Sequence, residues 1–410
     1  MKLSLFIARR IAFNQQKSFS RFISRLAVTA TAFSIAAMIL TLSFVNGFKA
    51  AITGKIYRFW GHIRLQQYEP TKAIIAEETP LFGNDTVVQY IQHMPEVASI
   101  QPFATKSIIL KNKETIEGVL LKGVDKHYTF NKLQPFLIKG RWPTFPDTLY
   151  SKELALSTTT AQKMNVNIND SIYVYFISND FSATRYRKVC ITGLYKTGIE
   201  DYDKLFAIGD INLIRRLNNW QPNQVGGYEV TLKTAIMIDS INNQLFDILP
   251  VDWTSRTIAD IYPNLFSWIN IQNVNERVII IIMAIVAIIN LITCLIILVL
   301  ERTKMIGVLK ALGANNIFIQ KIFLYHATWI ACMGIFIGCS VGVGLGYLQQ
   351  QFGFIHLPEE SYYIAVAPVL FIPWQIAAVC ATALLTCFIT LILPTFLIRK
   401  INPVKAIRFQ

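Results

Sequence analysis

The sequence predicts an α-helical membrane protein with four transmembrane helices and a large mixed α/β domain outside the cytoplasm. The first observation is composition, because 53% of the 410 residues are hydrophobic and only 16% are charged. Soluble proteins usually carry about 25% charged residues. The second observation is a set of four long runs without a charged residue, and the third is that positive charge gathers in alternate segments between those runs.

Each apolar run supplies the ~20 residues that a helix needs to cross ~30 Å of hydrocarbon. We predict spans at residues 26–48, 278–300, 323–347 and 371–397. The basic segment before the first run is long, and the run exceeds the roughly 7–15 apolar residues of a signal peptide. We therefore expect the first run to be retained as an anchor.

The charge distribution sets the topology. Nearly all of the formal net charge of +14 lies in residues 1–25, 301–321 and 398–410, whereas 49–277 and 348–370 are close to neutral or acidic. Positively charged loops stay in the cytoplasm. Both termini and residues 301–321 are thus predicted inside, with an amphipathic helix in 1–25, and the basic character is no sign of a nucleic-acid partner.

The 229 residues from 49 to 277 are enough for one large external domain or two small ones. Their patterns alternate between helix and strand. Asn84 and Asp210 can cap helices, residues 107–110 and 115–121 suggest a hairpin, and a helix is expected over 152–164. A mixed α/β domain follows.

No motif for catalysis or metal binding emerges. The five histidines are scattered, and Cys190 is the one cysteine of six outside the predicted spans. There is no GxxxxGK[ST] motif for phosphate binding. We therefore expect a non-catalytic chain without a metal or cofactor of its own.

Gly334, Gly338, Gly342 and Gly346 recur every four residues in the third predicted span. They include a GxSxG match, but that nucleophile motif needs a strand, a tight turn and a helix. Small residues at this spacing line one helical face and let another helix approach closely. We predict a packing face for a helix of the same chain or of a second subunit.

Residues 301–321, ERTKMIGVLKALGANNIFIQK, join the second and third predicted spans. Met305, Leu309 and Leu312 share one face of a short helix, Gly313 can end it, and Asn315 or Asn316 can cap the next helix. On periodicity alone the segment is either a basic turn that fixes topology or a docking helix.

ERTKMIGVLKALGAN resembles the coupling segment of the FtsX/MacB-type ABC transporter permeases. FIARRIAF at 6–13, SFVNGF at 43–48, KIYRFWGHI at 55–63, MPEVASIQPF at 94–103 and NVNERVII at 273–280 resemble the lipoprotein-releasing (Lol) branch. The resemblance covers most of the chain and implies a MacB-like periplasmic domain between the first and second spans.

This resemblance implies a permease of the bacterial inner membrane that pairs with a second, identical or similar permease over two ABC ATPase subunits. ATP and Mg²⁺ would be bound by the ATPases, whose motion would enter through Met305, Ile306, Leu309, Leu312 and Gly313. The pair would pass a lipoprotein from the outer leaflet to a periplasmic carrier.

Two further sites are implied by the family. A lipid cavity between the first and second spans would involve Met38, Leu42, Val45, Phe48, Ile281, Ile285 and Ile288. The place of the family's carrier-binding hairpin is Ser178–Arg187, where Phe181, Arg185 and Tyr186 could contact a carrier. An ordinary hairpin tip is the alternative there.

Two other functions stay open at this stage. One is a cell-division-type signalling permease that controls a cell-wall hydrolase, although that type has a much smaller external domain. The other is a permease of a tripartite drug or peptide efflux pump, which often carries a fused ATPase.

Overall fold

The computed structural model describes residues 18–69, 77–113, 115–146, 150–176 and 185–395. The predicted amphipathic helix falls largely, and the cytoplasmic tail wholly, outside these residues. The chain divides into two compact units. The membrane unit comprises Met1–Ala50, Trp268–His356 and Val366–Gln410, and the external unit comprises Ala51–Ser267 and Leu357–Ala365.

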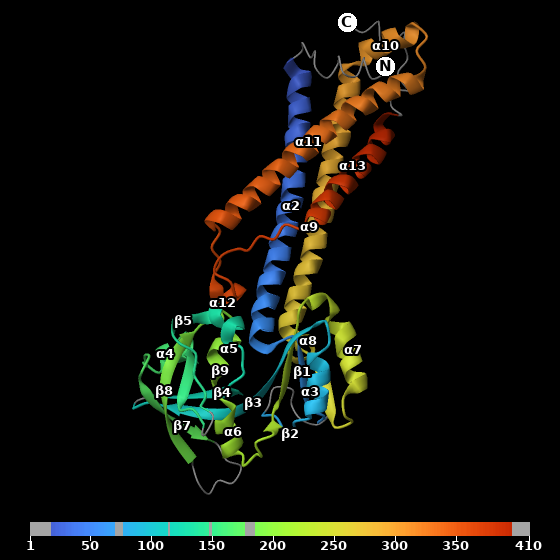
Figure 1. Ribbon diagram of the computed structural model, residues 1–410. Helices are drawn as coiled ribbons and strands as arrows, with labels where there is room; N and C mark the ends of the chain where they lie inside the picture. The colour runs from blue at the N-terminus through green and yellow to red at the C-terminus, as the bar shows by residue number, and fades with distance from the viewer. Residues whose placement is uncertain (1–17, 70–76, 114, 147–149, 177–184, 396–410) are drawn as a thin grey trace. The chain divides into compact units, whose positions relative to one another are not determined.

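Within the described residues, five helices belong to the membrane unit, and two of them continue into the external unit. They are α2 (Ser18–Trp60), α9 (Pro263–Glu301), α10 (Thr303–Ala311), α11 (Asn316–Phe352) and α13 (Pro373–Thr395) (Figure 1). Among the described residues, α2, α9 and α11 are long and apolar enough to cross a membrane, whereas α13 offers a shorter apolar stretch, Pro373–Ile389. The fourth span therefore stays a prediction.

Helix α2 is contacted from three sides within the membrane unit. Asn290 Nδ2 on α9 donates a hydrogen bond to the Ala27 carbonyl at 3.2 Å, and Asn46 Nδ2 donates to Gln375 Oε1 on α13 at 2.5 Å. Helix α11 packs on the third side. Side-chain amides that bond across apolar helices hold them in a defined register.

The glycine ladder packs α11 against α2 of the same chain. A Cβ atom built on Gly334 would meet Thr31, one on Gly338 would lie 2.5 Å from the Ala32 carbonyl oxygen, and one on Gly342 would lie 3.1 Å from the Ala36 Cα. The fourth glycine, Gly346, faces Phe371 instead. Three of the four predicted packing glycines thus lie against the first predicted span.

We predict that Gly338→Leu destabilises the membrane unit by about 1–3 kcal/mol or more, because the side chain would overlap backbone atoms of α2. The thermal unfolding temperature of the detergent-solubilised protein measures this. Gly344→Leu is the matched control, because nothing lies within 4 Å of a Cβ at Gly344. Equal unfolding temperatures for the two variants would contradict the close α2–α11 packing.

The external unit is built on a ten-stranded sheet of order β12-β1-β11-β3-β4-β9-β6-β8-β5, in which β7 pairs with both β3 and β8. The strands are β1 (Ile63–Gln67), β3 (Val97–Lys111), β4 (Ile116–Val124), β5 (Leu137–Gly140), β6 (Glu153–Ser157), β7 (Ser171–Phe176), β8 (Arg185–Tyr195), β9 (Phe206–Asp210), β11 (Gly227–Leu232) and β12 (Trp253–Thr257). Strands β2 (Leu81–Phe82) and β10 (Gln224–Val225) form a separate pair.

These pairings close a ring of six strands, β3-β4-β9-β6-β8-β7, with β12, β1 and β11 extending one side of it. The α-helices described within the external unit are α3 (Asp85–Gln92), α4 (Thr158–Lys163), α5 (Glu200–Leu205), α6 (Ile211–Leu217), α7 (Ile238–Ile248), α8 (Ile258–Ile261) and α12 (Glu359–Tyr362). Strand β1 follows α2 and pairs with β12, which precedes α8 and α9. Helices α2 and α9 are therefore connected to neighbouring strands at one edge of the sheet.

Several local predictions are confirmed. Asn84 Oδ1 accepts from the Val87 amide at the start of α3, Asp210 caps α6, and β3 and β4 form the expected hairpin. The helix predicted over 152–164 is wrong in its first half, because Glu153–Ser157 is a strand. Those residues are buried between β8 and β9, and sheet pairing overrides their helical spacing.

Candidate functional site

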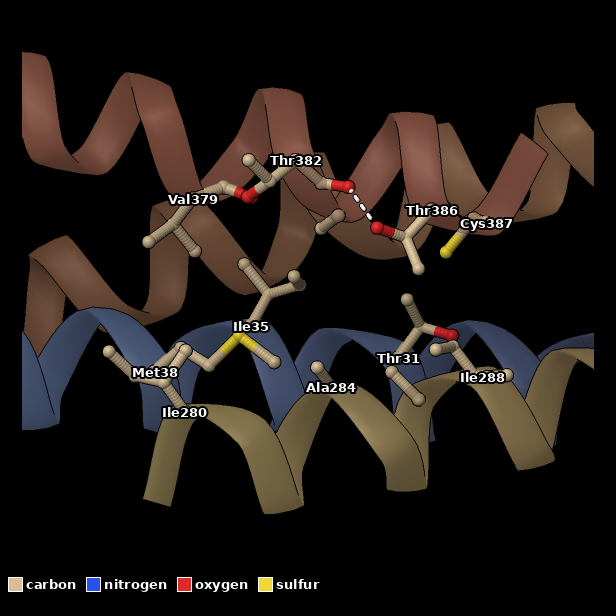
Figure 2. A pocket seen from close by; sticks show the side chains of 12 residues that line it. Thr31, Ile35, Met38, Ile280, Ala284, Ile288, Val379, Thr382, Thr386 and Cys387 are labelled. Atoms are coloured by element: carbon tan, nitrogen blue, oxygen red, sulfur yellow. Dashed lines mark hydrogen bonds between the residues drawn. The ribbon is translucent and has the colours of Figure 1, made fainter. Parts of the chain in front are cut away.

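The membrane unit contains a cavity of about 130 Å³ among α2, α9 and α13 (Figure 2). Its lining residues recur every three to four positions on each helix, as expected when one face of each helix is presented to a shared space. They are Thr31, Ile35 and Met38 of α2; Ile280, Ala284, Ala287 and Ile288 of α9; and Val379, Thr382, Ala383, Thr386 and Cys387 of α13.

The lining is apolar except for three threonine hydroxyls. Thr382 Oγ1 donates to the Ala378 carbonyl and Thr386 Oγ1 to the Thr382 carbonyl, each at 2.7 Å, so both serve their own helix. Thr31 Oγ1 is buried and has no hydrogen-bond partner among the described residues. An apolar cavity of ~150 Å³ stays dry and binds a small hydrocarbon. This cavity can likewise hold a short length of hydrocarbon chain.

The predicted cavity residues divide into two groups. Met38 and Ile288 line the cavity, whereas Ile281 and Ile285 are 58% and 50% exposed and are not among its lining residues. Leu42 is buried elsewhere along α2, Val45 is half-buried, and the Phe48 ring lies 5.8 Å from the Trp268 ring. Leu42, Val45 and Phe48 are not among the lining residues.

Sequence reasoning missed the α13 wall and the Thr31–Ile35 part of α2. The register of α2 could have been extended back from Met38 to Ile35 and Thr31 by helical spacing. Nothing in the sequence indicates which face of the last apolar run turns toward the first, because that run is apolar on all sides.

Between α9 and α11 lies the short helix α10 (Thr303–Ala311). Gly313, at φ +86°, follows its carboxyl end, and Asn315 Oδ1 accepts from the Ile317 amide at the start of α11. A positive φ strongly favours glycine, so Gly313 fixes the end of α10. The expected helix and its boundaries are therefore present.

Not every predicted coupling residue is exposed at the surface. Ile306 is fully buried, and Met305 and Leu309 pack against the core made by α9 and α11. Leu312 is 79% exposed, and Val308 and Ile317 are about half exposed. The exposed apolar surface of this segment, here called the α10 tip, consists of Val308, Leu312 and Ile317.

Comparison with known families decides the identity. The profile of the FtsX-like permease C-terminal family matches residues 277–403, and that of the MacB-like periplasmic core domain matches residues 24–246, more than half of the chain. The chain belongs to the MacB/FtsX-type permease family. The permease is an inner-membrane protein with a periplasmic domain, which is the external unit.

Curated relatives extend along nearly the whole permease. The lipoprotein-releasing system transmembrane protein LolC of Buchnera aphidicola is 23% identical over 98% of this chain and 97% of its own length. LolE of Haemophilus influenzae is 22% identical over 84% of this chain and 82% of its own. The crystal structure of the periplasmic region of MacB from Actinobacillus actinomycetemcomitans covers 51% of this chain and 95% of its own at 14% identity, with a TM-score of 0.36.

The expected carrier-binding tip of the permease is only partly described. Phe181 lies outside the described residues, whereas Arg185 and Tyr186 open β8 and are exposed. The Tyr186 ring lies 5.9 Å from that of Tyr173 and 5.8 Å from that of Tyr175. Three tyrosines thus share one face of the β7–β8 hairpin, where Lys188 is also exposed.

A buried ionic cluster surrounds the carboxyl end of α2 in the permease. Lys122 of β4 is completely buried; its Nζ donates to the Phe59 carbonyl and pairs with Glu229 Oε1 at 2.7 Å. Burial lowers the pKa of Lys122 to about 8, and Glu229 opposes that shift. The Arg64 guanidinium stacks 3.8 Å from the Trp60 ring. These contacts fix the last turn of α2 in the periplasmic sheet.

His62, two residues beyond α2, is a buried histidine that is expected to make the stability of the periplasmic domain depend on pH. Its ring stacks on Tyr57 at 4.4 Å, and its Nδ1 accepts from the Leu232 amide at 3.1 Å. Burial, followed by the charge of Lys132, lowers the pKa of His62 to about 4. The unfolded histidine titrates near 6.5, so between about pH 6.5 and 4 the unfolded chain binds a proton that the folded chain does not.

We predict that the free energy of unfolding falls by about 1–3 kcal/mol as the pH drops through this window. The acids Glu78 and Asp203 have a pKa raised by burial, which favours folding at low pH, so the His62 effect must be measured as a difference. Comparing wild type with His62→Phe by hydrogen exchange at several pH values gives that difference. Parallel pH profiles of the two proteins would contradict the assignment to His62.

Proposed function

We propose that this chain is the permease subunit of an ABC transporter that withdraws lipoproteins from the outer leaflet of the inner membrane. A separate ATPase supplies the energy, and a periplasmic carrier receives the product. The observation that carries the proposal is the match to LolC relatives over 98% of the chain, which includes both the membrane helices and the periplasmic domain. Four spans with both termini in the cytoplasm complete the proposed topology.

The energetics call for a motor. Withdrawing hydrocarbon from a bilayer costs ~0.8 kcal/mol per CH₂, so one fatty chain of roughly 15 methylenes costs about 12 kcal/mol. A lipoprotein with several such chains leaves the membrane very slowly without help. ATP hydrolysis coupled to helix movement lowers this barrier.

The α2–α9–α13 cavity is the proposed acyl subsite. Its lining residues lie within the predicted spans 26–48, 278–300 and 371–397, so the cavity is expected inside the hydrocarbon core, where an acyl chain resides. The hydrocarbon would contact Ile35, Met38 and Ile288. Because these side chains are apolar, the acyl chain could move from bulk lipid into the cavity without meeting a charged group.

We expect Ala284→Phe to lower the rate of lipoprotein release at least tenfold, because a phenyl ring fills the cavity that Ala284 lines. ATPase association should be retained, since α10 is untouched. Ile285→Phe is the matched control, because Ile285 is half exposed and lies outside the lining. Release by Ala284→Phe at the wild-type rate would remove the cavity from the transport path.

Two ATPase copies and a second permease, identical or similar, complete the proposed transporter. The α10 tip supports an ATPase partner, because an apolar surface at a connection predicted to be cytoplasmic is costly to leave in water. ATP and Mg²⁺ would be held by the ATPases. In this proposal the permease itself catalyses no reaction.

The β7–β8 face is the proposed carrier contact. The exposed Tyr173 and Tyr186 form an aromatic cluster with the half-buried Tyr175. Lys111 Nζ lies 5.8 Å from the Tyr175 ring, and Lys188 is opposite Tyr173. Aromatic residues dominate the energetics of many protein interfaces. A carrier with an acidic rim around an apolar opening would fit this surface.

Depleting the protein in its native bacterium tests this function against its alternatives. Lipoproteins destined for the outer membrane should then accumulate in the inner membrane. Filamentation with normal lipoprotein sorting would instead indicate a signalling permease, and drug sensitivity with normal sorting would indicate an efflux pump. Either of these outcomes would overturn the proposal.

A further inference from the structure

The connection between α11 and α13 is divided between the two compact units. Residues 357–365 belong to the external unit, whereas the residues on either side of them belong to the membrane unit. The chain therefore passes between the units not only along α2 and α9 but also on both sides of this segment. We call residues 357–365 the clasp.

The flanks of the clasp are fixed to the membrane helices. The Leu370 amide donates to the Ser43 carbonyl of α2 at 3.0 Å, and a Cβ on Gly47 would lie 2.4 Å from the Pro368 carbonyl oxygen. Gln349 at the end of α11 donates to the Ala367 carbonyl at 3.1 Å and accepts from the Ile355 amide at 2.9 Å. The two flanks therefore follow α2 and α11.

The clasp itself is fixed to the periplasmic domain by two lysines. Lys196, at the end of β8, pairs with Glu359 Oε2 at 2.5 Å. Lys55, in the last turns of α2, donates from Nζ to the Tyr363 carbonyl at 2.8 Å. Tyr363 has a positive φ of +60°, a conformation that costs free energy for a residue other than glycine and that surrounding contacts must maintain.

The segment that the clasp contacts, Thr197 and Gly198, is held by hydrogen bonds to Asp203. Asp203 is buried and its carboxylate accepts from the Thr197 amide at 2.9 Å, the Thr197 hydroxyl at 2.8 Å and the Gly198 amide at 3.0 Å. Gly198 takes a positive φ of +75°, and a Cβ there would approach Lys55 Nζ, Glu359 Oε1 and the Tyr363 carbonyl. Backbone and clasp therefore meet closely at Gly198.

We propose that the clasp is a mechanical tie that transmits movement of the α11–α13 pair to the periplasmic domain, as a third route beside α2 and α9. The proposal rests on the proposed function for its output, since the transmitted movement would drive lipoprotein release. Ile317 of the α10 tip lies in the first turn of α11, so a force applied there would reach the clasp through one continuous helix.

One substitution is enough to break the Lys196–Glu359 ion pair of the clasp. Lys196 and Glu359 are 42% and 30% exposed, and an ion pair of this kind contributes only modestly to stability. Placing a carboxylate at residue 196 would replace the attraction by repulsion from Glu359. The fold is preserved because neither side chain lies in the core.

Hydrogen exchange of the full-length protein in lipid nanodiscs tests the attachment. The Tyr363 amide donates to the Glu359 carbonyl at 2.8 Å and the Leu357 amide to the Ala365 carbonyl at 2.9 Å, so both should be protected. Lys196→Glu should raise exchange over 357–365 several-fold. Lys204→Glu is the matched control, because Lys204 pairs with Glu200 on α5. Equal exchange in both variants would overturn the attachment.

Coupling tests the transmission. With the ATPase present, Lys196→Glu should lower the number of lipoproteins released per ATP hydrolysed several-fold while ATP hydrolysis continues. A Lys196→Cys/Glu359→Cys pair, in a chain that carries Cys190→Ser, should couple normally when joined by a short bis-methanethiosulfonate cross-linker and lose coupling after reduction. Raised exchange with unchanged coupling would overturn the transmission. If the wild type released no lipoprotein, the proposed function would fail, while the exchange result would still judge the attachment.

Discussion

Leu312→Asp is expected to abolish co-purification of the ATPase while the permease still inserts into the membrane. Leu312 is 79% exposed at the α10 tip and makes no contribution to the buried core, so a carboxylate there leaves the fold intact. It would place an unpaired charge in an apolar contact, which costs several kcal/mol. Affinity purification of the tagged permease from membranes measures the bound ATPase.

Two further variants sharpen this result. Val308→Asp should also lose the ATPase, because Val308 shares the α10 tip. Lys304→Ala should keep it, since Lys304 is exposed but basic residues here chiefly set topology. Undiminished co-purification with Leu312→Asp would show that α10 is not the docking element, and loss of ATPase with Lys304→Ala would assign docking to charge.

Lys122→Met is expected to destabilise the periplasmic domain by about 3–5 kcal/mol. The substitution leaves the buried Glu229 carboxylate and the Phe59 carbonyl without their cationic partner, and an uncompensated buried charge is strongly unfavourable. Hydrogen exchange of β4 and β11 in increasing urea measures the loss. Because Phe59 lies in the last turn of α2, the α2 end should lose protection in the same step.

The matched control for this change is Lys188→Met, which removes an exposed lysine of β8 and should have almost no effect. Adding Glu229→Leu to Lys122→Met should recover much of the lost stability, because no unpaired charge then remains. Arg64 would keep its interaction with Glu78. A double variant as unstable as the single one would show that the unpaired Glu229 carboxylate is not the cause of the loss.

Much of the membrane unit could be predicted from the sequence because its signals are local. Uninterrupted apolar length predicts the spans, and Gly313 and Asn315 mark the end of α10 and the start of α11 by backbone chemistry alone. The four-residue spacing of Gly334, Gly338 and Gly342 predicts a close helix contact. The sequence left the partner helix open, and α2 of the same chain fills that role.

What could not be predicted depends on rotation and on long-range pairing. The hydrophobicity of Leu309 and Val308 does not reveal that Leu309 turns inward and Val308 outward, because both side chains are apolar. The strand at Glu153–Ser157 is set by its neighbours β8 and β9, whose paired residues lie more than thirty positions away in the sequence. The Lys122–Glu229 pair was missed because charged residues in strands are normally assigned to the solvent-facing side.

Release of a lipoprotein from reconstituted vesicles is the direct test of the proposed function. The permease and its co-purifying ATPase are placed in vesicles that bear a triacylated lipoprotein, and ATP is added with a soluble periplasmic carrier. We expect lipoprotein in the supernatant, bound to the carrier, only when ATP, carrier and an intact α10 tip are all present. ATP hydrolysis without any release, whichever carrier is supplied, would contradict it.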